Sequence, residues 1–532
     1  MRIHFVPLMI LLGVIGAMAV SLPAQDSMRS APPDLTSSSR AKLPQDDAPG
    51  GRLALPQIVS PAISFFPNIY VADTVINNSD PNLTNTDHMG DTEPSIALNP
   101  TSCVEASSTI ANQGCQEIVI LAFSGSWGGT GSYAPLWHST NGGVLWTKES
   151  TIPIPPNVMG AAGCPCDQTP DWDRSNNLSA TFLTDSTSGT NVYSGSTTDP
   201  ADGNQWSWFI SGGSAQRTNH FGVNQADQPW LLVNRDPDNP AQTDTYVDYD
   251  DFGGAPDEHV AVSYGLDPPD FTVDTLDGYS TGGINPGHRI AVDPRNGTVY
   301  SLFQQCTANC NGTPKTIDYV MNRSTDGGMT WTLNGSQTGI VVATGQSVQP
   351  TPKFGTVNAL LGGVEHLTVD SRTGDVYVVY GNRDSMTGND RLSIVRLTDN
   401  GSGGLNIGPS FFVTGQVEAA LPSVAVARNT SGSVGVLYTT FNGFDPTTGL
   451  PIFSAHLAVS SDHGMTFHDV TMATWLSVVG DNNNNRQRVL GDYQQLKSVG
   501  LGFYGTFTAN GAPFGRPFAN TDAIFFKTFV GP

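Results

Sequence analysis

Nine residues of the sequence combine side-chain types suited to acid–base chemistry, and each stands at or near the start of a short apolar segment. Brought together in space, facing carboxylates would raise one another's pKa and divide the roles of general acid and general base. The candidate catalytic residues are Glu93, Asp227, Glu365, Asp492 and Tyr493. The candidate substrate-binding residues are Asp171, His288, Arg289 and His366.

Two reactions fit this set of side chains. A pair of carboxylates is what hydrolysis of a glycosidic bond requires. A His or Tyr beside an Arg would instead suit proton abstraction next to a uronate carboxylate, which is the chemistry of a polysaccharide lyase. The residues therefore predict a glycan or polysaccharide as the partner. They leave three possibilities open: a glycoside hydrolase, which we favour, a lyase, and a non-catalytic protein that binds glycan or protein.

Strands must position these residues, because the chain shows almost no helical period. Runs of five to eight residues rich in Val, Ile, Tyr, Phe and Thr alternate with turn clusters, as at 117–123, 375–380 and 502–507. The sequence therefore predicts an all-β fold.

Three segments share one turn motif: STNGGVLW at 139–146, STDGGMTW at 324–331 and SSDHGMTF at 460–467. In a tight hairpin the Asp side chain can accept backbone N–H groups, and the Gly can take a positive φ. Asn141 replaces the Asp in the first copy. The motif resembles the Asp-box, or BNR repeat, of sialidase-like β-propellers. That resemblance implies a propeller in which Asp326 and Asp462 stabilise peripheral turns.

A second repeat marks the front of each expected blade. EPSIALNP at 93–100 recurs loosely as GHRIAVDP at 287–294 and as VEHLTVD at 364–370, with weaker copies near Asp171, Asp227, Leu421 and Asp492. Seven starts predict a single propeller of seven blades, with the strand around 68–73 completing the last one. Six blades, the number in sialidases, is the alternative. Because the innermost strands of a propeller converge on its axis, the nine candidate residues should meet at the channel mouth.

The chain departs from sialidases where their chemistry should appear. A sialidase holds the substrate carboxylate with three Arg, the first in an R-I-P motif early in the propeller. Here no Arg occurs between Arg52 and Arg174, and the only R-P dipeptide is Arg516-Pro517. A lone Lys148 cannot reproduce a bidentate Arg clamp. True exo-sialidase activity is thus a weaker alternative, and the resemblance carries over the fold but no catalytic residue.

The balance of acidic and basic residues excludes one class of binding partner. The chain has 47 acidic and 24 basic residues and a net charge of -23. A polyanionic surface repels phosphate backbones, so we expect no nucleic-acid partner. We find no G-x-S-x-G elbow, H-E-x-x-H motif, P-loop or dinucleotide fingerprint in the sequence.

The first residues predict export. Arg2 precedes an apolar run from Phe5 to Val20, and small residues suited to cleavage follow. We expect a signal peptide at 1–24, a linker rich in Pro, Ser and Ala at 25–62, and the propeller at 63–532. The mature chain should be secreted, extracellular or periplasmic, without integral membrane contact, and we expect a monomer.

Six cysteines fall as near neighbours: Cys103 with Cys115, Cys164 with Cys166, and Cys306 with Cys310. Local disulfides fit an exported chain, and no His or further Cys stands close to the two tightest pairs to complete a zinc site. We expect no cofactor and no metal, with calcium as the one ion left open. Two acidic stretches, 236–244 and 248–251, could supply oxygen ligands for it, although neither matches an EF-hand.

Overall fold

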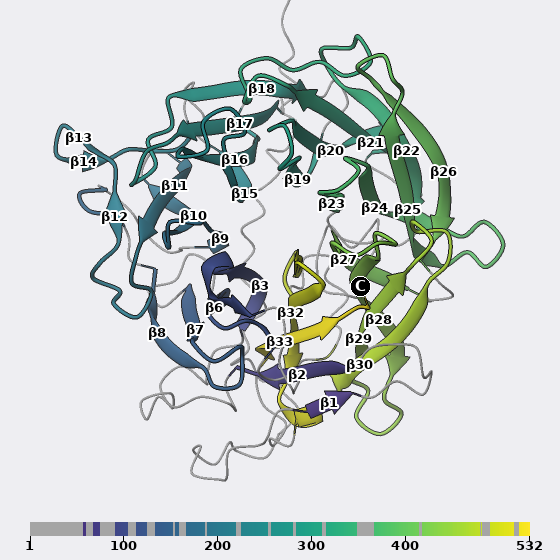
Figure 1. The fold of residues 1–532 in the computed structure, drawn as a ribbon. Helices are drawn as coiled ribbons and strands as arrows, with labels where there is room; N and C mark the ends of the chain where they lie inside the picture. Colours follow the sequence, from purple (N-terminus) through teal and green to yellow (C-terminus); the bar gives the residue numbers. More distant parts are fainter. Residues whose placement is uncertain are drawn as a thin grey trace, which may run out of the picture.

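A computed structural model shows a seven-bladed β-propeller, with seven antiparallel sheets arranged in a ring around a central channel (Figure 1). The predicted fold class and the preferred blade number are therefore confirmed. The structure describes residues 57–59, 68–74, 91–104, 113–124, 134–152, 155–158, 166–186, 189–219, 225–253, 257–279, 284–310, 315–347, 366–413, 418–478, 480, 490–514 and 521–531.

Each blade is built from consecutive strands that run outward from the channel. From blade 1 to blade 7, the inner strands are β3 (Asp91–Leu98), β9 (Cys166–Trp172), β15 (Ala226–Arg235), β19 (Ile284–Val292), β23 (His366–Val369), β27 (Ala419–Val426) and β31 (Gln495–Val499). The second strands are β6 (Ile118–Ser124), β10 (Leu178–Ser186), β16 (Thr243–Asp251), β20 (Val299–Ala308), β24 (Val376–Arg383), β28 (Val434–Phe444) and β32 (Gly502–Asn510).

The outer half of each blade completes the sheet. The third strands are β7 (Pro135–Ser139), β11 (Gly189–Thr197), β17 (Asp257–Tyr264), β21 (Lys315–Ser324), β25 (Asp390–Asp399), β29 (Pro451–Ser460) and β33 (Thr521–Phe529). The fourth strands are β8 (Thr147–Thr151), β12 (Ser207–Trp208), β18 (Val273–Tyr279), β22 (Ile340–Ser347), β26 (Leu405–Phe412), β30 (His468–Leu476) and, in blade 7, β2 (Ile69–Asp73).

Blade 7 closes the ring with strands from both ends of the chain. β2 pairs with β33, as predicted for the strand around 68–73. A further strand, β1 (Gln57–Val59), pairs with β2 inside the range predicted as linker. Pairing early with late strands holds both ends of the chain in one blade and so closes the ring.

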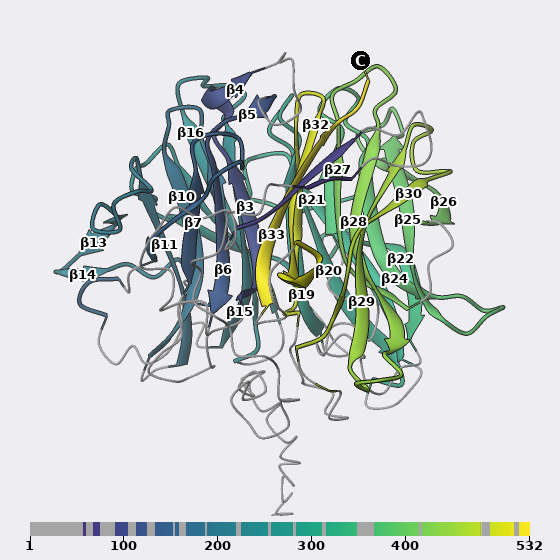
Figure 2. The same cartoon turned by 90° about the horizontal axis from the view of Figure 1, so that it is seen from below.

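The seven predicted blade starts all fall in an inner strand or within three residues of one. We call the end of the channel where the inner strands begin the start end, and the opposite end the turn end. Because the sheets are antiparallel, the second strands finish at the start end and the third strands finish at the turn end. Figure 2 shows the propeller from the side, with β4 (Cys103–Val104) and β5 (Gly114–Cys115) at the turn end.

The three repeated turns share one set of hydrogen bonds, and each joins a third strand to a fourth. In the second copy Gly328 N donates to Ser324 Oγ at 2.8 Å, and Thr330 N donates to Asp326 Oδ1 at 2.9 Å. Gly328 has a φ of 90°, which a side chain would strain. The aromatic residue that follows, Trp331, donates from its indole to Thr275 Oγ1 of the preceding blade at 2.9 Å. These turns therefore tie neighbouring blades together at the periphery.

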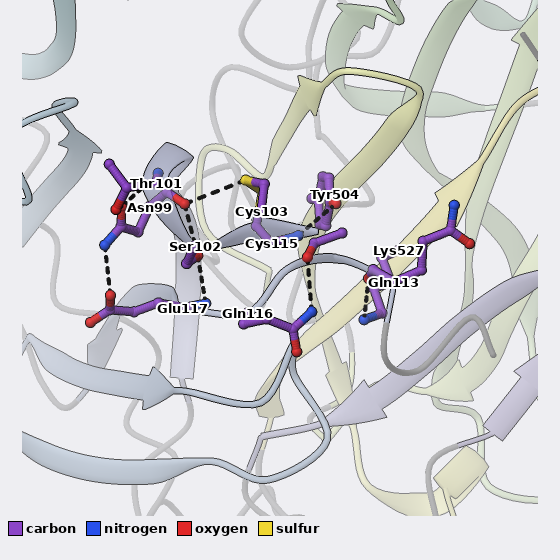
Figure 3. Close-up of a disulfide and its surroundings, with 11 residues drawn as sticks. Asn99, Thr101, Ser102, Cys103, Gln113, Cys115, Gln116, Glu117, Tyr504 and Lys527 are labelled. Atoms are coloured by element: carbon purple, nitrogen blue, oxygen red, sulfur yellow. Dashed lines mark hydrogen bonds between the residues drawn. A yellow bond between two sulfur atoms is a disulfide. The ribbon is translucent and has the colours of Figure 1, made fainter. Parts of the chain in front are cut away.

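Two of the three predicted cysteine pairs are disulfides, Cys103–Cys115 and Cys306–Cys310, while Cys164 lies outside the described residues. Figure 3 shows the first, which joins β4 to β5. Cys115 N donates to Tyr504 Oη at 3.0 Å, and Lys527 Nζ donates to the Gln113 carbonyl at 3.0 Å, so the loop is anchored on blade 7. Further short elements are β13 (Ile210–Ser211), β14 (Ser214–Ala215) and the 3-10 turns η2 (Pro100–Ser102) and η5 (Ala512–Phe514).

Apolar side chains fill the spaces between neighbouring blades. One cluster joins Trp230 and Tyr246 of blade 3 to Ile290 and Val299 of blade 4, and all four are buried. Similar clusters join other neighbours around the ring. Burial on both faces of each sheet holds the inner strands in fixed positions around the channel, which is what a site built from several strands requires.

Candidate functional site

The inner strands begin with an irregular backbone. The pairing register of β3, β9, β15 and β27 shifts near the start of each strand, as at a β-bulge. Each shift contains a non-glycine residue with positive φ, namely Glu93 at 52°, Asp167 at 49°, Gln228 at 44° and Leu421 at 56°. Such a conformation costs roughly 1–3 kcal/mol per residue and commonly occurs beside functional sites. The bulges turn polar side chains toward the interior of the start end.

A chain of hydrogen bonds joins four inner strands at this end. Asp492 N donates to Glu93 Oε1 at 3.2 Å, and Gln228 Nε2 donates to Asp492 Oδ2 at 3.0 Å. Arg289 Nη2 in turn donates to Gln228 Oε1 at 3.2 Å. All of these side chains are buried. Glu93, Asp492 and Arg289 therefore meet as predicted, and Gln228 links the carboxylate of Asp492 to the guanidinium.

Aromatic rings close the channel just below this network. The Arg289 guanidinium lies 4.2 Å from the centroid of the Trp230 ring and 5.8 Å from that of Tyr493. The Trp230 ring also lies 5.5 Å from the His366 ring. Cation–π contacts compensate part of the cost of burying a guanidinium that is only 1% exposed. We call Trp230, Arg289 and Tyr493 the partition.

Tyr493 is a buried phenol. Its hydroxyl donates to the Gln168 carbonyl at 3.1 Å. Burial, and after it the negative charges of Glu93 and Asp167, raises the pKa of Tyr493 well above its ordinary value. The side chain therefore stays protonated at neutral pH.

A second group of acids occupies the start end of blade 3. Asp227 of β15 and Glu258 of β17 stand opposite Asp250 of β16 in the strand register, so the three side chains share one face of the sheet. Asp250 Oδ2 accepts a hydrogen bond from Gly287 N of blade 4 at 3.1 Å. His288, also buried, has Nε2 4.0 Å from Asp248 Oδ2. A His thus faces several carboxyls across the gap between two blades.

Asp250 has an unusual protonation behaviour within this group. Burial raises its pKa to about 7, the charge of His288 opposes the rise, and the charge of Asp227 adds to it. Asp227 is less buried than Asp250. One carboxyl that exchanges its proton near neutral pH beside a second, more accessible one is an arrangement that can divide acid and base roles.

Two of the nine predicted residues point to the other end of the channel. Asp171 is the sixth of seven residues in β9, so it lies near the end of its strand and not near the start, which corrects the predicted placement. Its Oδ1 accepts a hydrogen bond from Lys497 Nζ of blade 7 at 2.7 Å. The His366 ring contacts Trp230 of the partition and faces the turn end of the channel. Glu365 lies outside the described residues and stays a prediction.

Asp171, His366 and Lys497 line a cavity of about 880 Å³ at the turn end. The cavity is lined from the inner strands of all seven blades, and Trp230 separates its floor from the start end. His366 Nδ1 accepts a hydrogen bond from Val424 N at 3.3 Å. Burial first, and then the charges of Arg289 and Lys497, lowers the pKa of His366 to about 3, so the imidazole is neutral. The channel therefore has two chemically different ends.

The acidic stretches considered for calcium are used within the protein. Asp236 Oδ1 accepts backbone N–H groups of Asp238 and Asn239, each at 2.8 Å, which closes a turn. Burial raises the pKa of Asp244 to about 6. Within the described ranges, no group of three or more His, Cys, Asp or Glu side chains is arranged to hold a metal ion.

Three residues of the site carry no sequence signal for the role they have here. Gln228 follows the predicted Asp227, but a neutral amide gives no signal of its own. Asp250 belongs to a stretch considered for calcium, although it lies in a strand next to the inner one. Lys497 lies five residues after Asp492, and only the fold shows that it reaches Asp171 across blade 1.

Comparisons with known proteins find distant matches among solved structures only. No family model and no curated protein matches the chain. Among solved structures, an alpha-L-arabinanase from Penicillium chrysogenum, in complex with arabinobiose, has a TM-score of 0.38 at 14% identity over 65% of this chain and 88% of its own. An alpha-L-arabinofuranosidase from Fusarium graminearum has a TM-score of 0.39 at 13% identity over 70% and 98%. An intramolecular trans-sialidase from Ruminococcus gnavus has a TM-score of 0.38 at 11% identity over 66% and 91%.

These neighbours are glycoside hydrolases and a sialidase by their descriptions. At identities and TM-scores this low, the likeness carries no argument about the fold or the activity of this chain. Over the described ranges, no helix has the length and hydropathy of a membrane span.

Proposed function

We propose that the chain is a secreted, carbohydrate-active propeller that hydrolyses a glycan at the start end of its channel. The observation that carries the proposal is the pair of carboxyls on blade 3. Asp250 is buried, its pKa is raised to about 7, and it stands opposite the more accessible Asp227 in the strand register. Hydrolysis of a glycosidic bond needs one carboxyl that gives a proton and one that acts as base or nucleophile.

The roles follow from accessibility and charge. Asp227, the more accessible carboxyl, acts as base or nucleophile, and Asp250, which keeps its proton up to about neutral pH, is the acid that protonates the leaving oxygen. Glu93 and Asp492 act as positioning residues, because their hydrogen bonds through Gln228 fix Arg289 and the starts of four inner strands. His288 lies opposite these carboxyls across the gap between blades 3 and 4. The sequence also predicts Glu365 and Tyr493 as catalytic. Glu365 stays a prediction for mutagenesis, and Tyr493 is buried in the partition.

The test is product formation from a panel of neutral polysaccharides, uronate polymers and sialosides. Reducing ends and the absorbance of unsaturated products are read together. Reducing ends without absorbance support a hydrolase, whereas both signals together support a lyase. Release of sialic acid alone would restore the exo-sialidase alternative. Glycan binding with no product from any substrate would replace the proposal with the non-catalytic binding module.

Variants connect any activity to the site. Asp227→Asn and Asp250→Asn should each lower kcat by at least a hundredfold, since each removes a proton-transfer group. The matched control is Asp238→Asn, which makes the same change at an exposed carboxyl in a distant turn. Unchanged turnover in both site variants would sink the proposal, provided that their thermal unfolding matches that of the control.

The same proposal includes export of the chain and the assignment of its three repeated turns to the Asp-box family. We propose a signal peptide at 1–24, a linker at 25–62 and a monomeric propeller at 63–532, and we propose that the three repeated turns are Asp-boxes. Two disulfides in the described residues support an oxidising compartment. The N-terminal sequence of protein collected from the culture medium tests the first point. A chain that stays cell-associated and begins at Met1 would contradict it.

A further inference from the structure

The turn-end cavity has the size and lining of a ligand site. Its volume of about 880 Å³ lies within the range usual for pockets that hold small molecules. Apolar side chains, among them Leu232, Val292 and Val369, form much of its wall. Trp230 and His366 form its floor. The proposed hydrolysis makes no use of this end of the channel.

Cations gather at the mouth of this cavity in an otherwise acidic protein. Arg174 and Arg235 line the mouth and are exposed, and each stands where an inner strand leads into the second strand of its blade. Among the described residues neither guanidinium forms an ion pair, and Arg235 Nε donates only to the Pro240 carbonyl, at 2.8 Å. Lys497 lines the interior, with its side chain 16% exposed.

The carboxylates nearby are largely committed to other partners. Asp171 accepts from Lys497 Nζ on one oxygen and from Val233 N on the other. Asp173 Oδ1 accepts from two backbone N–H groups of its own turn, those of Ser175 and Asn177. Asp236, the third carboxylate of the lining, accepts from Asp238 N on one oxygen and from Gln242 Nε2 on the other. Both oxygens of Asp171 and Asp236 and one oxygen of Asp173 are therefore directed into the protein, while the two guanidiniums keep donors available at the mouth.

Arg295 provides an internal contrast. It lines the same mouth, but its guanidinium donates to both oxygens of Asp293 and is therefore neutralised. Arg174 and Arg235 have no such partner within the part of the chain that the structure describes. Two unneutralised guanidiniums beside a cavity of mixed polar and apolar lining are suited to an oxyanion, because the planar N–H fork matches the geometry of carboxylate, sulfate and phosphate groups.

We propose that the turn-end cavity binds a small organic anion, with an oxyanion group held by Arg174 and Arg235 and a sugar-sized body inside the cavity. This site is distinct from the proposed hydrolytic site, because the partition of Trp230, Arg289 and Tyr493 lies between them. A net charge of -23 on the whole chain repels anions in general, so binding must depend on these local donors. The ligand is a carboxylated, sulfated or phosphorylated molecule.

Calorimetric titration with three probes tests the site. Glucuronate and glucose 6-phosphate carry a carboxylate and a phosphate on similar bodies, and glucose carries no charge. We expect at least one of the two anions to bind, and its affinity to weaken as salt is raised. Glucose should bind at least tenfold more weakly. Equal binding of glucose and the anions, or no binding of either anion, would overturn the proposal.

Variants locate the binding. Replacing both arginines (Arg174→Gln with Arg235→Gln) should weaken anion binding by about a hundredfold, because each charge-assisted hydrogen bond contributes about tenfold to the affinity. Arg323→Gln is the matched control for each single replacement, since Arg323 donates to the Gly403 carbonyl outside the cavity and its replacement removes one positive charge. Equal affinity in the double variant and the control would refute the site.

Two more variants separate this site from the hydrolytic one. Thr368→Trp should fill the cavity and block binding of the anion without changing any charge. Asp227→Asn should abolish turnover and leave anion binding as in the unmodified protein. Loss of anion binding in Asp227→Asn would place the anion at the start end and overturn the proposal, whatever the fate of the hydrolase assignment. If Thr368→Trp does not fold, the arginine variant decides alone, because Arg174 and Arg235 are exposed.

Discussion

The two ends of the channel use the same seven inner strands in opposite ways. At the start end Glu93, Asp250 and Asp492 are buried, and their hydrogen bonds run between blades. At the turn end the charged groups Arg174 and Arg235 stand exposed around a cavity. Burial at the first end raises the pKa of Asp250, because it disfavours ionisation, whereas the two guanidiniums at the mouth of the second end stand in solvent.

The backbone explains this difference. Bulges and positive-φ residues begin β3, β9, β15 and β27, and they direct polar side chains inward. The later parts of the inner strands pair regularly and leave a wider lumen. A propeller can therefore carry two sites on one set of strands, with reactive groups where the backbone is irregular and a binding cavity where it is regular.

The largest predicted effect comes from opening the partition. Trp230 is 2% exposed and contacts Arg289, Tyr493 and His366. Trp230→Ala should lower the free energy of unfolding by about 3–5 kcal/mol, through reduced burial and an added cavity. Chemical denaturation measures this loss. A fall below about 1 kcal/mol would mean that the partition does not hold the two ends apart.

The two ends should also respond oppositely to pH. The pKa of Asp250 is raised from 3.8 to about 7, so stability should fall as pH rises through that window, because the unfolded chain ionises first. The pKa of His366 is lowered from 6.5 to about 3, so the stability of the neutral imidazole is present above 6.5 and is lost as pH falls toward 3. Over its full pH window, each residue should change the free energy of unfolding by on the order of 4–5 kcal/mol.

Two variants show which residue causes each change of stability with pH. The two windows overlap between pH 4 and pH 6.5, where the two contributions oppose each other. In that range Asp250→Asn should leave a rise of stability with pH, and His366→Gln should leave a fall. Thermal unfolding across pH 4 to 8 gives both curves. Parallel pH curves for Asp250→Asn and the unmodified chain would show that this carboxyl does not titrate differently in the folded state.

A smaller effect tests the irregular backbone of the start end. Gly491 has a φ of 79°, and a Cβ at this position would come within 2.7 Å of Glu93 N. Gly491→Ala should therefore cost about 2 kcal/mol and disturb the hydrogen bond between Asp492 N and Glu93. Gly500→Ala is the matched control, with a φ of 59° and no atom near the added Cβ. Equal losses in the two variants would show that strain alone, and not the approach to Glu93, sets the cost.

The sequence predicted the features that depend on repetition and local spacing. Seven blade starts, the third-to-fourth strand turns at 139–146, 324–331 and 460–467, and the disulfides Cys103–Cys115 and Cys306–Cys310 all follow from short-range patterns. The meeting of Glu93 with Asp492 also followed, because closure of a propeller brings the first blade beside the last.

What the sequence could not show depends on register within a strand. The motif predicts Asp171 near the start of a strand. In the structure β9 begins at Cys166, with a bulge at Asp167, so Asp171 lies near the end of the strand. Asp250 lies on a second strand, where no repeat marks it. The role of Lys497 requires a contact between blades 2 and 7, which no local pattern encodes.

The smallest predicted effect is a difference in stability between variants of Arg235 and Arg295, which both line the turn-end mouth. Arg295 is paired with Asp293 but its side chain is 39% exposed, so Arg295→Gln should cost no more than about 1 kcal/mol. Arg235→Gln should change stability by less than about 0.5 kcal/mol, because the side chain is exposed and forms no ion pair within the described residues. Thermal unfolding at low and high salt measures both. The salt dependence should appear in the Arg295 comparison alone, since salt screens an existing ion pair. If Arg235→Gln proved as costly and as salt-sensitive as Arg295→Gln, its guanidinium would already be neutralised within the protein, and the turn end would lose the donors that distinguish it from the start end.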